Sequence, residues 1–316
     1  SGWREPIWKT RSSSTRQVSG EWVGTKDVDW NRLLPDGCRL TESKYSNLLE
    51  TCRRASFLYR QGLAGDLPAL GTWNSFNDFL FLLCQWLVLE SARYHPAQHA
   101  LASLDNEGIR RLYRALGRGN WMEALRVFER CLNGVHQAVF GKPCPSDLLD
   151  SPGSWPQSLR NEVIAWLEAN DGFTRDKRRS TNHSGQVSRE LLGRMANLSP
   201  QQLTTHSLNA VLRQFEPKLQ HPHLLLPSSF RTEYPGHRTP FLHDALSGAG
   251  SESVVNKANT HLFNLLKLYR HLPDVLPDPS GFRLKDAQRD ANRLTKSPGS
   301  TPFIPIDTGL RYLNEA

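Results

Sequence analysis

The sequence predicts a mainly α-helical protein with an N-terminal arm of short strands or irregular chain, a helical bundle and a second helical domain. Its 316 residues include 38% hydrophobic side chains, which supply enough apolar surface for a folded core and exclude a disordered chain. From residue 41 onward, apolar residues recur at three- and four-residue steps, as on one face of a helix. At about 100–200 residues per domain, the length favours two domains.

Residues 1–40 carry few helical signals, and we expect them to form the arm. The stretch EWVGTKDVDW at 21–30 alternates between apolar and polar residues, which indicates short strands or extended chain. Tryptophan side chains can stack on bases or dock on a neighbouring subunit. We expect them instead to anchor the arm to its own domain. The four tryptophans of this region are Trp3, Trp8, Trp22 and Trp30.

Residues 41–140 are predicted to form a bundle of four helices. The first carries Leu48, Leu49 and Cys52 on one stripe and ends near Gly62. The pattern Ser75-Phe-Asn-Asp78 resembles a capping box, so we expect the second helix to run from Ser75 to about residue 94. Caps for the third and fourth helices are expected at residues 105 and 120.

Beyond the bundle, residues 141–155 read as a linker and residues 156–296 as a second helical domain. A long helix of that domain is expected to begin near Ser251. Five prolines prevent regular structure over 216–240, and so long an irregular segment is usually functional or interface-forming. Residues 297–316 are expected to be a second linker and the start of a truncated helix.

The charge balance points to a polyanionic partner. Lysine and arginine number 39 against 31 acidic residues, a formal net charge of +8. Clustered cations neutralise phosphates and release counterions, so we expect the most basic segment to bind DNA, with a solvated surface loop as the alternative. The candidate DNA-binding residues are Arg175, Lys177, Arg178, Arg179, Arg189 and Arg194. A second basic stretch, 283–296, contains Asp286 and Asp290, which favour ion pairs within a helix.

No catalytic constellation is recognisable, so whether the protein is an enzyme stays open. The sequence has no phosphate-binding loop, no dinucleotide fingerprint, no HExxH and no GxSxG. A third alternative is a hydrolase of unrecognised type built on a histidine group in the proline-rich region. Because acidic or cysteine ligands are missing nearby, we expect no metal and no cofactor there. The group consists of His221, His223, His237 and His243.

We expect a cytoplasmic protein without a membrane segment. The most apolar run, 79–89, is shorter than the about 20 residues that cross a bilayer, and the first 30 residues lack the apolar core of a signal peptide. The five cysteines are an odd number without a CxxC pair, which favours reduced thiols.

The segments LTESKYSNLLETCRRASFLYR (40–60) and NSFNDFLFLLCQWL (74–87) resemble the core-binding region of the large tyrosine recombinases, or integrases, of mobile elements. The closing segment 300–316 resembles the approach to their catalytic domain. The resemblance implies a helical clamp around DNA, with strand cleavage in a separate domain by a tyrosine assisted by two arginines, a lysine and a His-x-x-Arg.

This chain contains no His-x-x-Arg, and Tyr312 lacks the accompanying arginines, so no catalytic residue can be assigned. Either the catalytic domain lies beyond the sequence, or the protein is a non-catalytic relative. We therefore expect the DNA-binding part of a tyrosine-recombinase-like protein, with double-stranded DNA as its partner and a homo-oligomer on the DNA as an option. The alternative is a helical interaction scaffold that binds a partner protein through its proline-rich segment.

Overall fold

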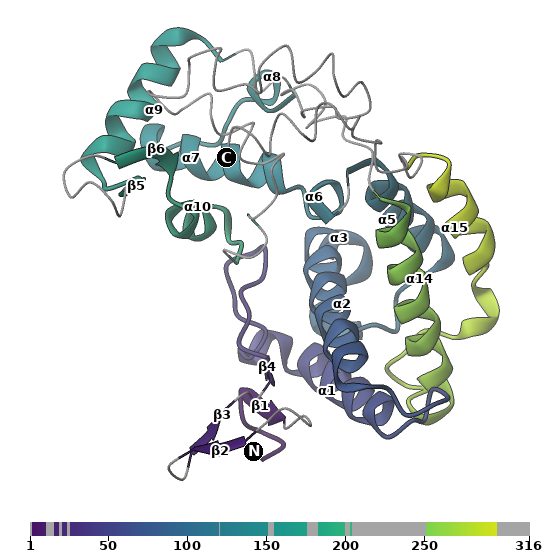
Figure 1. Cartoon of the computed structure of the whole chain (residues 1–316). Helices are drawn as coiled ribbons and strands as arrows, with labels where there is room; N and C mark the ends of the chain where they lie inside the picture. Colours follow the sequence, from purple (N-terminus) through teal and green to yellow (C-terminus); the bar gives the residue numbers. More distant parts are fainter. Residues whose placement is uncertain are drawn as a thin grey trace, which may run out of the picture.

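The structure, a computed structural model, confirms the mainly helical fold (Figure 1). It describes residues 2–10, 16–18, 21–23, 26–119, 121–150, 155–175, 183–199, 203 and 251–295. The longer helices are α1 (Ser46–Arg60), α2 (Leu70–Leu89), α5 (Asn106–Gly119), α7 (Val127–Phe140), α9 (Gln157–Ala169), α10 (Arg189–Ala196), α14 (Glu252–Lys267) and α15 (Leu284–Asn292). The short helices are α3 (Ser91–Tyr94), α4 (Pro96–His99), α6 (Trp121–Ala124) and α8 (Ser146–Asp150), with 3-10 turns at Ser43–Tyr45, Leu268–His271 and Pro279–Gly281.

The strands form three small antiparallel pairs within the described residues. In the arm, β1 pairs with β4 in the register Ile7 to Asp29, and β2 pairs with β3. The third pair, β5 with β6, lies between α9 and α10 in the sequence. The strands are β1 (Ile7–Thr10), β2 (Arg16–Val18), β3 (Glu21–Val23), β4 (Lys26–Asp29), β5 (Phe173–Arg175) and β6 (His183–Val187).

Tryptophans anchor the arm to its own helices, as predicted. Trp30 is fully buried, and its ring lies 5.2 Å from that of Phe81 on α2. Trp8 packs against Trp30 at 5.0 Å. The guanidinium of Arg53 on α1 donates to the Glu5 carbonyl at 2.8 Å, which fixes the beginning of the arm. Base stacking is therefore not needed to explain these aromatic side chains.

The helix α2 begins at Leu70, so the predicted start at Ser75 is wrong. Pro68 precedes the first turn, and Ala69 is extended (ψ 153°) and forms the N-cap, so the helix starts two residues after the proline. Ser75 lies within the second turn and its hydroxyl contacts His261 on α14 at 3.0 Å. The pattern Ser75-Phe-Asn-Asp78, which resembles a capping box, therefore lies inside α2 and does not mark its beginning.

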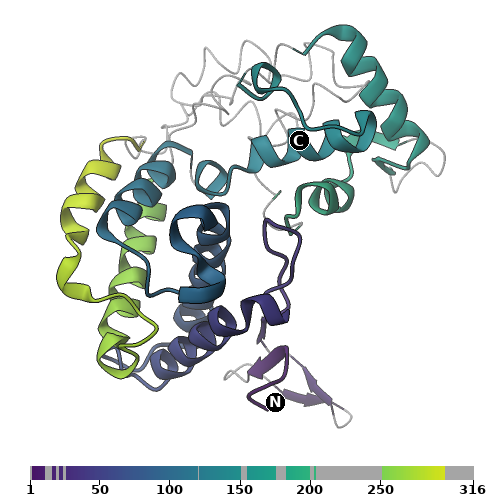
Figure 2. The same ribbon diagram turned by 180° about the vertical axis from the view of Figure 1, so that it is seen from behind.

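The helices α14 and α15 pack against α5 (Figures 1 and 2). The helix α14 begins next to Ser251, as the sequence predicts, and Ser251 caps it by accepting a hydrogen bond from the Ser253 amide at 3.2 Å. The side chain of Asn264 donates to the Tyr59 hydroxyl at 3.3 Å, which ties α14 to α1 as well. Residues 251–295 thus complete the same helical body as α1, α2 and α5.

A second group of elements lies at the other end of the molecule in both views and consists of α7 to α10 with β5 and β6 (Figures 1 and 2). Here α7 packs mainly on α10 rather than on α1 or α2. The predicted four-helix bundle therefore has different members, because α14 and α15 take the place expected for α7. The division of the chain into domains at 141–155 stays a prediction.

Several predicted features lie outside the described residues. They are the cap at residue 120, the proline-rich segment 216–240 with its histidine group, and residues 297–316. Among the helices that the structure describes, none is long and apolar enough to cross a membrane.

Candidate nucleic-acid interface

The helix α5 carries its apolar side chains on one face and arginines on the other. Ile109, Leu112, Tyr113 and Leu116 are fully buried. The Tyr113 hydroxyl donates to Asn259 of α14 at 3.2 Å, so this face points into the helical body. Because these four residues are buried on one side of α5, the residues on its opposite side face solvent.

Four arginines occupy the opposite face. At 100° per residue, positions 110, 111, 114 and 118 fall within a stripe about 100° wide. We call this stripe the α5 arginine face, and it consists of Arg110, Arg111, Arg114 and Arg118. Arg114 and Arg118 are exposed and form no ion pair with any residue that the structure describes. Two guanidinium groups are therefore available to an external anion.

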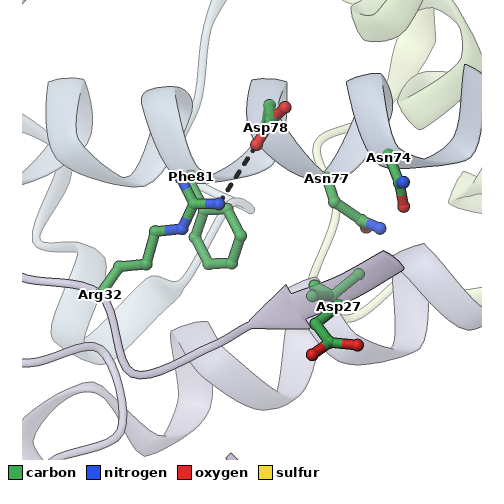
Figure 3. A pocket seen from close by; sticks show the side chains of 7 residues that line it. Asp27, Arg32, Asn74, Asn77, Asp78 and Phe81 are labelled. Atoms are coloured by element: carbon green, nitrogen blue, oxygen red, sulfur yellow. Dashed lines mark hydrogen bonds and ion pairs between the residues drawn. The ribbon is translucent and has the colours of Figure 1, made fainter. Parts of the chain in front are cut away.

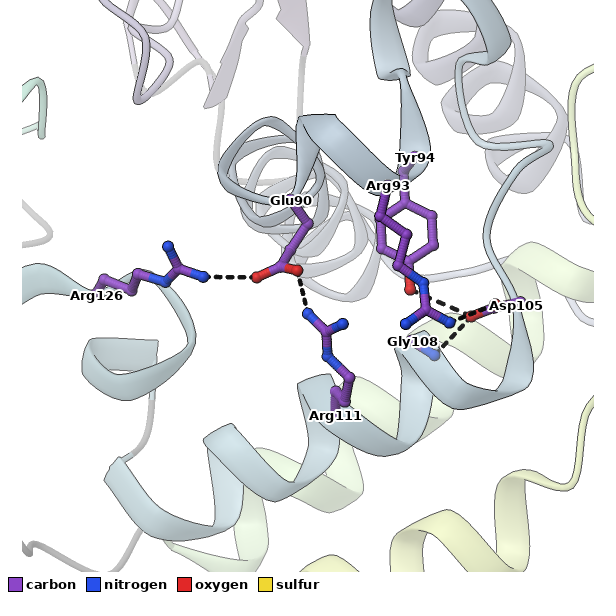
Figure 4. Close-up of polar contacts among 7 residues, drawn as sticks. All are labelled: Glu90, Arg93, Tyr94, Asp105, Gly108, Arg111 and Arg126. Atoms are coloured by element: carbon purple, nitrogen blue, oxygen red, sulfur yellow. Dashed lines mark hydrogen bonds and ion pairs between the residues drawn. The ribbon is translucent and has the colours of Figure 1, made fainter.

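Asp105 fixes the beginning of α5, as predicted (Figure 4). Its Oδ1 accepts hydrogen bonds from the Gly108 amide at 2.7 Å and from the Tyr94 hydroxyl at 3.2 Å, and its Oδ2 accepts from Arg93 at 2.8 Å. Burial by itself would raise the pKa of Asp105, but these three donors hold it below its ordinary value. A carboxylate at a helix N-terminus is also favoured by the helix dipole. The cap is therefore ionised at neutral pH.

Glu90 joins the α5 arginine face to the beginning of α7 (Figure 4). One carboxylate oxygen accepts from Arg111, and the other accepts from Arg126 Nη2 at 2.8 Å. The Glu90 side chain is only 15% exposed, whereas those of Arg111 and Arg126 are 37% and 46% exposed. One carboxylate cannot neutralise two guanidinium groups, so this cluster keeps a net positive charge.

The backbone at Arg126 has a φ of 49°, in the left-handed region that non-glycine residues rarely adopt. This residue directly precedes α7, and its side chain points toward Glu90 at the end of α2. A hollow of about 380 Å³ opens at this point, lined by the Glu90 cluster and by apolar side chains such as Trp86 and Phe128. Cationic groups therefore continue from α5 across the α6–α7 junction.

Arg130 has a structural role between α7 and α10. It donates to the Ala196 carbonyl at 3.0 Å and to the Asn197 carbonyl, at the C-terminal end of α10. Free carbonyls at a helix C-terminus attract a cation. Burial lowers the pKa of Arg130 to about 10, so the side chain stays charged at neutral pH. Gly134 permits the close packing, because a Cβ there would lie 2.5 Å from the Met195 carbonyl oxygen.

The structure brings together few of the sequence-predicted DNA-binding residues. Arg189 and Arg194 are exposed on α10, but they lie five positions apart in the sequence, which puts them about 140° apart around the helix. Arg175 ends β5, and its side chain lies outside the described residues. Lys177, Arg178 and Arg179 lie outside them altogether. The DNA-binding assignment of these six residues stays a prediction.

The second basic stretch forms a row on α15. Lys285, Arg289 and Arg293 are exposed at four-residue intervals and line a shallow hollow of about 460 Å³. Arg289 pairs with Asp286 at 3.1 Å, so the prediction of an ion pair within this helix is confirmed. This pairing leaves α15 less positive than the α5 arginine face.

The reading of the sequence missed the α5 arginine face, although the signal is present. The same pattern that places Ile109, Leu112 and Leu116 in the core also assigns the arginines between them to the opposite face. Residues 106–130 contain six arginines against three glutamates. A search for runs of consecutive charges finds 175–179 and overlooks charges spaced along a helix.

The chain matches no protein-family model, no curated protein and no solved structure. Within the part of the chain that the structure describes, histidine, cysteine, aspartate and glutamate side chains form no group of three that can hold a metal ion. A functional conclusion therefore depends on the residues and their geometry.

Proposed function

We propose that this protein binds double-stranded DNA through the α5 arginine face. The observation that carries the proposal is the placement of four arginines on one side of a helix whose other side is locked into the core. Arg114 and Arg118 are exposed and without an ion pair among the described residues. A rigid helix presents these charges without a large entropic cost of ordering them on binding.

The spacing of the arginines suits a DNA backbone. Arg110 and Arg118 are eight residues apart, or about 12 Å along the helix at 1.5 Å per residue. At about 3.4 Å of rise along the DNA axis per nucleotide, this length equals the rise of three or four base pairs. A guanidinium group binds phosphate oxygens through two parallel hydrogen bonds. Such contacts position the protein on DNA, while base contacts supply sequence specificity.

We further propose that this binding belongs to a tyrosine-recombinase-like protein. The support is the resemblance of residues 40–60 and 74–87 to the core-binding region of that class. In the structure these segments fall in α1 and α2, which pack in the same helical body as α5. No residue of this chain is assigned to strand cleavage.

The test is the salt dependence of DNA affinity, measured by fluorescence anisotropy with a labelled duplex. The double variant Arg114→Gln, Arg118→Gln removes two phosphate contacts and leaves the core unchanged. We expect weaker binding, with the slope of log affinity against log salt reduced by about 2. The predicted α10 residues are compared through Arg189→Gln, Arg194→Gln.

The matched control is Arg4→Gln, Arg54→Gln, which removes the same charge from exposed positions in the arm and on α1. We expect this control to keep the slope of the unchanged protein. Equal loss in all three double variants contradicts a defined interface, because it is the behaviour of a diffuse positive charge. Absence of DNA binding at low salt overturns the proposal and favours the scaffold alternative.

A further inference from the structure

Two exposed histidines lie at the two ends of the short helix α4. His95 directly precedes the helix and His99 is its last residue, so the pair has the spacing His-x-x-x-His. Their ring centres lie 6.3 Å apart, and the ring planes are nearly perpendicular, at 82°. Histidines at this spacing on one side of a helix hold zinc in metalloproteases. Both rings reach solvent, so an ion from outside can contact them.

The backbone of this turn is held in one conformation. His95 has a φ of 42° and Ala100 a φ of 49°, so residues with positive φ stand at both ends of α4. Ala100 is fully buried, and Asn47 of α1 donates to the Gln98 carbonyl at 2.9 Å. These contacts fix the turn to the helical body. The two imidazoles are therefore presented as neighbours, and binding both to one ion costs little ordering entropy.

The spacing of the two rings suits a shared metal ion. A zinc–nitrogen bond of about 2.0–2.1 Å places the metal about 3.2 Å from each ring centre. At a tetrahedral angle, two rings on one metal then lie about 5.2 Å apart. The observed 6.3 Å is longer by about 1 Å, and exposed side chains cover such a difference by small rotations.

Charges near the pair and elsewhere leave it the better ligand set for a metal ion. Arg93, two residues before His95, pairs with Asp105 at 2.8 Å, so its positive charge is compensated. Asp27 and Asp78 line a hollow between β4 and α2, but Arg32 pairs with Asp78 there at 3.2 Å (Figure 3). A guanidinium group bound to the carboxylate repels a metal ion. This hollow is therefore not a competing site.

We propose that His95 and His99 together bind one divalent transition-metal ion of the class of Zn²⁺, Ni²⁺ and Cu²⁺. Imidazole nitrogen suits these ions, whereas Mg²⁺ and Ca²⁺ prefer oxygen ligands. Two protein ligands leave the other coordination positions to water or to a ligand from outside the chain. The proposal does not depend on DNA binding by α5.

The test is a calorimetric titration of the full chain with Ni²⁺. We expect His99→Gln to bind the ion at this pair about tenfold more weakly or less, because the second imidazole no longer adds an intramolecular contact. His95→Asn should show the same loss, and asparagine tolerates the positive φ at this position, so the turn keeps its backbone. An excess of Mg²⁺ should leave the Ni²⁺ titration of the unchanged protein unaltered.

Two control variants remove histidines outside the pair. His271→Gln removes a single exposed histidine, and the double variant His221→Gln, His223→Gln removes two histidines of the proline-rich segment. Both controls should keep the Ni²⁺ affinity of the pair. Unchanged Ni²⁺ binding in His95→Asn and His99→Gln overturns the proposal. A loss of equal size in either control overturns it as well, because histidines elsewhere then hold the ion.

Thermal unfolding separates loss of the ligand from loss of the fold. Because both side chains are exposed, His99→Gln and the unchanged protein should have the same melting temperature without metal. Saturating Ni²⁺ should raise the melting temperature of the unchanged protein more than that of His99→Gln, since the ion binds the folded pair. An equal rise in both proteins contradicts a metal site at this turn.

Discussion

At the scale of single residues, His261 couples the fold to pH. It is 4% exposed on α14, and its Nε2 lies 3.0 Å from the Ser75 hydroxyl of α2. Burial, and then the charge of Lys257, lower the pKa of His261 to about 4. The folded protein therefore keeps this imidazole neutral at pH values where the unfolded chain, with an ordinary pKa near 6.5, already binds a proton.

We expect the free energy of unfolding to fall as the pH is lowered from 6.5 toward 4. In this window the unfolded chain binds more protons at position 261 than the folded chain, so each lost pH unit removes up to about 1.4 kcal/mol. In His261→Gln, the loss between pH 6.5 and 5 should be about 1.6 kcal/mol smaller than in the unchanged protein. Urea unfolding at the two pH values measures this difference.

The control variant replaces the exposed His99 by glutamine, which removes a histidine without altering the contact between α2 and α14. Identical losses in the unchanged protein and in His261→Gln contradict a neutral, buried histidine.

At the scale of helices, glycines set how closely two of the pairs approach. A Cβ at Gly117 of α5 would lie 2.5 Å from the Ala291 carbonyl oxygen of α15, a backbone atom that cannot move alone. We expect Gly117→Ala to destabilise the protein by about 1–3 kcal/mol, because overpacking forces the helices apart. Thermal unfolding, with a lowered melting temperature, tests this expectation.

Gly71 is the matched comparison, since it lies in the exposed first turn of α2 with no heavy atom within 4 Å of an added Cβ. We expect Gly71→Ala to stabilise the protein by about 0.5–1 kcal/mol through helix propensity. Destabilisation by both substitutions would argue against close helix contact as the cause at Gly117.

The helices also show how far a sequence pattern reaches. Apolar spacing predicts α1, α5 and α14, and it predicts that α14 begins near Ser251, because these signals are local. It does not predict that α14 packs on α5, since the contact between Tyr113 and Asn259 joins residues 146 positions apart.

At the scale of the whole molecule, the net charge of +8 matters through its distribution. Arg54 on α1 pairs with Glu50 and Arg289 on α15 pairs with Asp286, whereas Arg114 and Arg118 form no ion pair with a described residue. Glu90 moderates this positive region by binding Arg111 and Arg126. It therefore limits how many guanidinium groups the protein can offer to phosphates.

Replacement of Glu90 by glutamine should strengthen DNA binding. The amide oxygen still accepts a hydrogen bond, but Arg111 and Arg126 lose their shared counter-charge and become available to phosphates. We expect higher affinity at low salt and a slope of log affinity against log salt that is steeper by about 1. Glu168→Gln makes the same change in net charge at an exposed position of α9 and should leave the slope unaltered. If the two variants raise the affinity equally, total charge is the cause and the Glu90 cluster has no part in the interface.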